Sequence, residues 1–296
     1  MLLAASSFAA MNAFARGLRA LPWPLLGLSR AVFGLGAALV VARVRGSSLA
    51  VRDRRVMWER SVFGSASMLC TFYALTHMPL ADATALLNTT PLWIALLARV
   101  RIGERASWRV YAALGAAFVG VVLVERPGLA VGDPAGVVAL CAGVTAAMAM
   151  VSLRRLSGEG VDAVVVHFSA VASAVMALLT LGWFARGGAM PAVGGGAVLG
   201  VLAMGMFATA GQFAMTRAYS LDKAARVGAT NFIQVLLALG VDAAVFGRLP
   251  AAGAAVGIGL VVAGGLLLVL DTARSITRGE GGPPARPSPE GPAAGG

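Results

Sequence analysis

Apolar runs follow one another along almost the whole sequence, separated by short polar breaks. A helix crosses the hydrocarbon of a bilayer with roughly 17–25 apolar residues, and breaks at Arg, Pro, Gly or Asp leave ten such runs. They lie near residues 2–20, 25–43, 59–77, 80–99, 107–124, 134–153, 162–184, 194–216, 224–246 and 251–270. The pattern therefore predicts an all-α membrane protein with ten transmembrane helices.

The composition favours lipid as the surroundings of this chain. Hydrophobic residues make up 58% of it and charged residues 12%, and the mean hydropathy is +0.83, far above that of a soluble domain. The connections between runs are too short to hold a soluble domain. From Asp271 onward the chain is rich in Pro and Gly, so residues 271–296 are predicted to form a disordered cytoplasmic tail.

Basic residues gather in alternate connections. The net charge is +11, with 24 Lys and Arg residues. If both chain ends are cytoplasmic, 18 of these, Arg60 included, fall on the cytoplasmic side, 5 fall on the other side, and Arg30 lies within a span. This bias is typical of inner-membrane proteins, and it explains the charge without nucleic acid as a partner. We expect a multi-pass protein of the cell inner membrane with both termini in the cytoplasm.

The amino terminus and the cysteines add two expectations. Met1 runs directly into an apolar stretch ending in Ala13-Phe14-Ala15, a superficial match to a signal-peptidase site, but no basic segment precedes it. We expect an uncleaved first span. Cys70 and Cys141 lie inside apolar runs without metal-ligand spacing, so we expect no disulfide, no metal site and no cofactor.

Two segments, 73–124 and 216–270, carry similar features in the same order at an offset of about 143 residues. The offset places Asn88 on Asn231, Pro91 on Gln234 and Arg105 on Arg248. Five spans, an odd number, separate equivalent positions, so the two halves insert with opposite orientation, as in many secondary transporters. We expect two inverted five-helix repeats, residues 1–126 and 134–270.

Short motifs accompany this repeat. The first half carries Tyr73-Ala74-Leu75, Met78-Pro79-Leu80-Ala81-Asp82-Ala83, Pro91, Gly103-Glu104-Arg105 and Arg126-Pro127-Gly128. The second half echoes them with Gln212, Thr216-Arg217-Ala218-Tyr219, Ala224-Ala225 and Phe232-Ile233-Gln234. Over residues 1–270 the pattern resembles the EamA-type transporters of the drug/metabolite transporter superfamily. One difference is Gly247-Arg248 before the tenth span, where the family usually repeats Gly-Glu, so Glu104 has no counterpart.

The resemblance implies a secondary transporter that moves a small metabolite or drug-like solute across the inner membrane by alternating access. The sequence has no Gly-rich loop followed by Lys-Ser or Lys-Thr, so ATP is not the direct energy source. Two alternatives stay open: an intramembrane enzyme acting on a lipid-linked substrate, and a non-transporting membrane subunit. The spans hold no visible acid–base or metal cluster, which favours a transporter over an enzyme. The expected partners are a small solute and the lipid bilayer.

Polar side chains inside the apolar runs are candidates for cargo binding, because they are costly when they face lipid. On the ninth span one helical stripe contains Asn231, Gln234, Ala238 and Asp242, and the matching stripe on the fourth contains Asn88, Pro91, Ala95 and Arg99. Such stripes line a cavity or form hydrogen bonds between helices. Asp242 is also close enough to the outer end for pairing at the interface.

Further positions complete the candidate set. Arg30, two turns into the second span, binds an anionic cargo group or reaches the outer interface. Tyr73 and His77 share one face of the third span, and Gln212 is an amide inside the eighth. Pro91 removes a backbone hydrogen bond near the middle of the fourth span. The candidate cargo-binding residues are Arg30, Tyr73, Asn88, Pro91, Gln212, Asn231 and Gln234.

Two further features are interpreted as structural. Glu104, at the cytoplasmic end of the fourth span, is expected to pair with Arg101 or Arg109 and to fix the following turn. Small residues in the fifth and tenth spans allow close approach of helix backbones: Gly115, Gly120, Gly253 and Gly257. Tight packing within one chain is the expected use of these glycines, and a homodimer face is the alternative.

Overall fold

The computed structural model of the chain describes residues 1–18, 21–77, 86–104, 106–125, 134–190, 194–232 and 256–264, together with 237 and 267. These described residues form helices and turns and contain no strand. The predicted all-α class is therefore confirmed. Several predicted features, Gln234, Ala238, Asp242 and the tail 271–296, lie outside the described residues.

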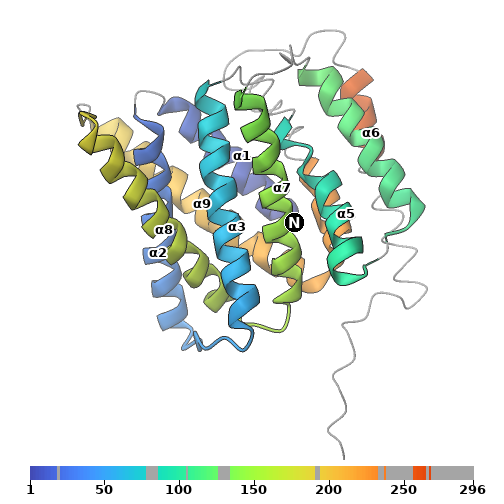
Figure 1. The fold of residues 1–296 in the computed structure, drawn as a ribbon, viewed down its shortest axis with the longest axis horizontal. Coiled ribbons are helices and arrows are strands. Elements are labelled where there is room, and N and C mark those ends of the chain that lie inside the picture. Colours follow the sequence, from blue (N-terminus) through green and yellow to red (C-terminus); the bar gives the residue numbers. More distant parts are fainter. Residues whose placement is uncertain are drawn as a thin grey trace, which may run out of the picture.

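The helices follow the apolar runs in order (Figure 1). They are α1 Leu2–Gly17, α2 Trp23–Val44, α3 Arg54–His77, α5 Thr90–Ile102, α6 Trp108–Glu125, α7 Pro134–Arg155, α8 Val161–Ala185, α9 Gly195–Leu221 and α10 Ala224–Ala229, followed by the 3-10 turn η1 Thr230–Phe232. Residues 256–264 are also helical. Four of the helices, α2, α7, α8 and α9, are long and apolar enough to cross a bilayer by themselves.

Four helices form the centre of the bundle. The most extensive packing joins α3 to α7, α2 to α8 and α1 to α9, while α2 also packs on α9 and α3 on α8. Helices α2, α3, α8 and α9 therefore surround a common centre. On one side of it α5 packs against α7 and α10, and Figure 1 shows α6 and α8 at opposite edges of the bundle.

The fourth predicted span is not one continuous helix. Leu86 and Leu87 are helical, Asn88 and Thr89 form a turn, and α5 starts at Thr90. The Thr89 hydroxyl donates to the Leu86 carbonyl oxygen at 2.6 Å, and the Thr90 hydroxyl donates to that of Leu87 at 2.7 Å. The Leu86 carbonyl oxygen also accepts the Thr89 backbone N–H at 3.1 Å, so the hydroxyls add side-chain hydrogen bonds to carbonyl groups at the turn.

This break corrects the expectation for Pro91. The residue lies in the first turn of α5, where a helix has no intrahelical partner for the backbone N–H that proline lacks. Pro91 therefore starts a helix and does not open a hydrogen bond in the middle of one. The ninth predicted span also changes geometry, because α10 ends at Ala229 and the 3-10 turn η1 carries Asn231.

Glycines hold α6 against the helical segment 256–264. A Cβ atom added to Gly120 would lie 2.5 Å from the Gly257 carbonyl oxygen, and one added to Gly264 would lie 2.7 Å from the Ala113 carbonyl oxygen. The two backbones are therefore in direct contact, as predicted for packing within one chain. Gly115 takes no part in this contact, because a Cβ there would meet nothing within 4 Å.

Charged side chains tie together the connections at one end of the bundle, where Figure 1 shows the α2–α3 and α7–α8 turns side by side. Asp162, at the start of α8, pairs with Arg45 at 3.1 Å and accepts a hydrogen bond from the Ser47 hydroxyl. Glu159 accepts the backbone N–H groups of Arg52 and Asp53 at 3.0 and 3.2 Å. We call this set the charged end.

Glu104 belongs to the same charged end, with a partner other than the expected one. Its carboxylate pairs with Arg154 of α7 at 2.8 Å and accepts the backbone N–H of Ala224, the first residue of α10, at 2.8 Å. The prediction of Arg101 or Arg109 was wrong, because the turn after α5 brings the carboxylate toward other helices. Arg101 instead lies 3.7 Å from Glu59 of α3.

Candidate functional site

A cavity lies between α2, α3, α8 and α9, at the common centre of the bundle. Its polar lining residues are Arg30, Ser169, Thr209 and Gln212, and its other lining residues are Ala31, Gly34, Met68, Val165, Phe168, Ala172 and Ala208. The empty space between these walls is about 340 Å³ when the part open to the surroundings is included, whereas the enclosed space is only about 20 Å³, room for about one water molecule. Pockets for small molecules are typically apolar with a few polar groups of this kind.

Small residues create this space. Ala31, Ala172 and Ala208 each place only a methyl group on the wall, and Gly34 places none. A Cβ added to Gly34 would lie 3.6 Å from both the Ser169 Oγ and the Thr209 Oγ1 atoms, which is ordinary contact distance. The gap opposite Gly34 is therefore about one methyl group deep.

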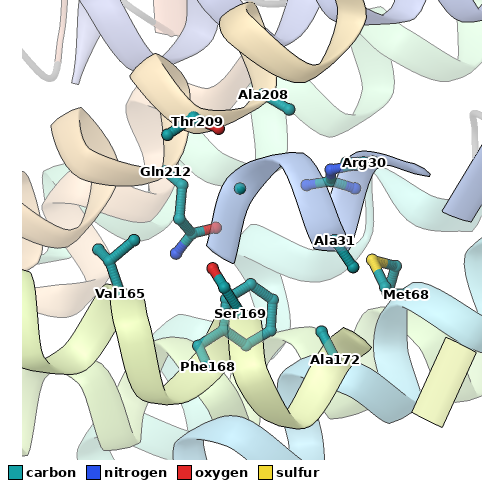
Figure 2. A pocket seen from close by; sticks show the side chains of 11 residues that line it. Arg30, Ala31, Met68, Val165, Phe168, Ser169, Ala172, Ala208, Thr209 and Gln212 are labelled. Carbon is teal, nitrogen blue, oxygen red and sulfur yellow. The ribbon is translucent and has the colours of Figure 1, made fainter. Parts of the chain in front are cut away.

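Gln212 presents its amide to the cavity. The residue is 6% exposed, and its Nε2 atom donates only a long hydrogen bond, 3.5 Å, to the Thr216 hydroxyl one turn later in α9. Figure 2 shows the Gln212 amide and the Ser169 hydroxyl directed toward each other. Within the described part of the chain, the Ser169 hydroxyl has no hydrogen-bond partner. These groups are available to a polar solute.

Arg30 lies farther along the same cavity, on α2 (Figure 2). No carboxylate of the described residues lies within ion-pair distance of its guanidinium group. The sequence predicted either an anion contact or a position at the outer interface. The position of Arg30 on the cavity wall favours the anion contact. A guanidinium group offers up to five hydrogen-bond donors in a planar fork.

Arg60 is the functional candidate that the sequence analysis missed. It was assigned to a cytoplasmic connection, but it lies inside α3 and is 1% exposed. Its guanidinium carbon lies 4.3 Å from the centre of the Phe168 ring, and Phe168 lines the cavity. The Nε and Nη1 atoms of Arg60 are buried without a hydrogen-bond partner.

The remaining candidates lie away from this cavity. Tyr73 and His77 stack on each other with ring centres 3.9 Å apart, and His77 Nδ1 lies 2.9 Å from the Tyr73 carbonyl oxygen. Asn88 lies in the turn before α5 and Asn231 in the 3-10 turn after α10, in the part of the bundle where α5 packs against α10. The structure therefore brings Arg30 and Gln212 together, and it leaves the other described candidates outside the cavity.

One sequence signal pointed to the missed lining residues. Thr209, Gln212 and Thr216 follow one another at intervals of three and four residues, so they form a polar stripe on α9. This stripe would have identified Thr209. Phe168 and the small apolar residues have no such signal, because apolar residues occur on every face of these helices.

This chain is similar to a known protein family and to individual known proteins. A family profile described as the EamA-like transporter family matches residues 1–126. The pseudopaline exporter CntI of Pseudomonas aeruginosa, strain UCBPP-PA14, is 30% identical over 271 residues, which cover 90% of this chain and 91% of the exporter. Solute carrier family 35 member G1 of Mus musculus is 26% identical over 220 residues, or 67% of this chain and 57% of the carrier.

A solved crystal structure shares the fold. It matches with a TM-score of 0.81 at 20% sequence identity and covers 92% of this chain and 96% of the other. The helices and their arrangement are therefore those of a known architecture.

Proposed function

Because this chain belongs to the EamA-like transporters of the drug/metabolite transporter superfamily, and is a membrane transporter of small solutes, we propose that it exports its cargo by alternating access. The exporter from Pseudomonas aeruginosa, aligned over nine-tenths of both chains, supports this direction of transport. Transport is the activity of the named relatives, so we propose that the chain is not an enzyme.

The observation that carries the proposal is the central cavity. It lies among the four innermost helices and exposes the polar groups of Arg30, Ser169 and Gln212. Polar groups inside a membrane bundle are costly, and those that occur there are typically functional. We therefore propose that Arg30 and Gln212 contact the cargo, and that Asn88 and Asn231 mark the breaks of two discontinuous helices.

Two inverted repeats, residues 1–126 and 134–270, are part of this proposal. If α1, α2 and α3 correspond to α7, α8 and α9, the α1–α9 contact corresponds to the α7–α3 contact, and α2–α9 corresponds to α8–α3. Both members of each pair are packed helix pairs, and α2–α8 corresponds to itself. This exchange supports a two-fold axis between the halves, the plan of many secondary transporters.

The charged end supports a cytoplasmic location for both termini. Four arginines lie there, in the connections between the second and third and between the sixth and seventh predicted spans: Arg45, Arg52, Arg154 and Arg155. Basic connections face the cytoplasm in inner-membrane proteins. The contacts between connections at this end also support a state closed to the cytoplasm, one of the two that alternating access requires.

Metabolite profiling of the growth medium tests export. Cells producing the protein are expected to enrich at least one small solute in the medium, and Gln212→Leu is expected to reduce that enrichment about tenfold or more, because a buried amide contact to the cargo is lost. Asn12→Leu is the matched control, since Asn12 is an exposed polar residue of α1. Enrichment inside the cells would contradict export, and equal enrichment by both variants would contradict the cavity as the binding site.

A further inference from the structure

Two arginines beside one cavity lack an acidic partner. Arg30 lines the cavity, and Arg60 packs its guanidinium group on Phe168, which lines the same cavity. Neither forms an ion pair with any of the described residues. At the charged end, by contrast, Arg45 and Arg154 each pair with a carboxylate.

The Arg60 side chain runs along α3 in the direction of the cavity. A Cβ added to Gly64, one turn later in α3, would collide with Arg60 Nη1 and would lie 2.8 Å from the Phe168 ring. Met68, one further turn on, lines the cavity. Gly64 therefore provides the room in which the guanidinium group reaches toward the cavity, and Phe168 separates it from the cavity lining.

The position of Arg60 is costly without an anion. The residue is 1% exposed, and its Nε and Nη1 atoms have no acceptor. A buried charge with unpaired N–H groups destabilises a protein, and stacking on an aromatic ring offsets only part of that cost. A residue that destabilises the fold when no ligand is bound is typical of a functional position.

The rest of the cavity favours an anion over a cation. None of its lining residues is acidic, and its other polar groups are an amide and two hydroxyls. Guanidinium groups bind carboxylates through paired hydrogen bonds, which are among the strongest that proteins form. Two such groups at one site match two acidic groups.

We propose that Arg30 and Arg60 form a two-arginine anion site, and that the cargo is a small organic acid with two acidic groups. The proposal rests on the transport function above and names its substrate class. One acidic group binds Arg30 in the open part of the cavity. The second binds Arg60 when the Phe168 ring turns aside, and the Gln212 amide contacts the cargo between them.

Thermal unfolding of the purified full-length protein in lipid nanodiscs tests the site without transport. The probes are linear dicarboxylates from succinate to suberate, with pentanediamine and pentanediol as cationic and neutral counterparts of glutarate. We expect at least one dicarboxylate to raise the Tm saturably, since binding to the native state stabilises it. Neither counterpart is expected to do so.

Variants separate the two arginines from other basic residues. Arg30→Met and Arg60→Met are each expected to weaken dicarboxylate binding about tenfold or more, because each removes a charge-assisted contact. Arg60→Lys is expected to retain part of the binding. Arg186→Met is the matched control, because Arg186 is exposed at the end of α8. Without ligand, Arg60→Met is expected to unfold at a Tm no lower than wild type, because it removes an unpartnered buried charge.

Three results would overturn the anion site: stabilisation by pentanediamine in place of the dicarboxylates, no stabilisation by any dicarboxylate, or unchanged binding in both Met variants. An Arg60→Met protein that fails to fold would make Arg60 structural and overturn its part in the site. Transport is judged separately. A protein that binds dicarboxylates but enriches no solute would contradict export and support the anion site. Export without dicarboxylate binding would support export and contradict the anion site.

Discussion

Gly34 shows how little space separates an open cavity from a filled one. A Cβ at this position would make ordinary contacts with Ser169 and Thr209, so no steric clash opposes a small side chain. Folding therefore tolerates either glycine or a small side chain at this position, and the lack of a side chain leaves space in the cavity.

Filling this position is expected to block transport and to leave folding intact. We expect Gly34→Ala to retain the wild-type Tm within a few degrees and to lower the export rate, because the new methyl group occupies cargo space. Gly36→Ala is the control, since a Cβ there meets nothing within 4 Å. Export rates and Tm values of the two variants provide the check, and equal export would place the cargo elsewhere.

Glu104 joins three segments through one carboxylate. It binds the Arg154 side chain and the first backbone N–H of α10, and both side chains of the ion pair are less than one-fifth exposed. At such a position a lost partner leaves a polar group unsatisfied, which costs more than the loss of a surface pair.

A double-mutant cycle measures this link. Glu104→Ala is expected to lower the free energy of unfolding by about 1–3 kcal/mol, because the Arg154 Nε atom and the Ala224 N–H lose their acceptor. Combined with Arg154→Ala, the two effects are expected to be non-additive by about 0.5–3 kcal/mol. Chemical unfolding in detergent gives both values. Additive effects would mean that the two side chains act independently.

Sequence reasoning identified the residues of the site that contrast with their surroundings. Arg30 and Gln212 are polar positions within apolar runs, so the cost of facing lipid made both of them candidates, with the outer interface as the alternative for Arg30. Arg60 follows Arg52, Arg54 and Arg55 closely, so charge alone placed it with the connection. The 1% exposure of Arg60 within α3, which starts at Arg54, shows that this side chain is inside the bundle.

At the scale of the elements, the contact between α6 and segment 256–264 depends on glycine. Gly120 and Gly257 bring the backbones together without intervening side chains. Helices in lipid gain little from apolar burial against each other, so this close packing is what holds such a pair together.

A single methyl group is expected to disturb this pair. Gly120→Ala should lower the free energy of unfolding by about 1–3 kcal/mol, because the new Cβ meets backbone atoms that cannot move aside. Gly115→Ala, in the same helix, should be neutral or stabilise by up to about 1 kcal/mol, since alanine favours helix and the space is open. Thermal unfolding of the two variants tests this prediction, and equal Tm values would contradict the close contact between α6 and segment 256–264.

The order of the helices followed from the sequence, but the break before α5 did not. Apolar runs separated by polar breaks predict where a helix can lie, and Asn88 and Thr89 are compatible with a place inside such a run. Whether they continue the helix depends on local hydrogen bonds from Thr89 and Thr90. Such hydroxyl groups occur in continuous helices as well.

At the scale of the molecule, the charged end joins the two halves of the chain. The connection after α2 contacts the start of α8 through Ser47 and Asp162, and Glu59 of α3 contacts Arg155 of α7. If the protein works by the proposed alternating access, these contacts are expected to separate in each transport cycle.

A reversible cross-link tests that movement. With Cys70 and Cys141 replaced by alanine, the pair Ser47→Cys and Asp162→Cys is expected to form a disulfide, because the native side chains are in hydrogen-bond contact. Oxidation should stop export and a reductant should restore it. Each single cysteine variant is the control. Full export by the oxidised protein would mean that this end does not open.

The threonines in the turn before α5 and at the end of α10 bear on how the chain can bend. Thr89, Thr90 and Thr230 donate to carbonyl oxygens of the preceding turn through their own side chains. A hinge at either point can flex in the bilayer without exposing a bare carbonyl to hydrocarbon. We therefore expect bending at these points to cost little free energy, and the glycine-packed and salt-bridged parts on either side to move as rigid bodies.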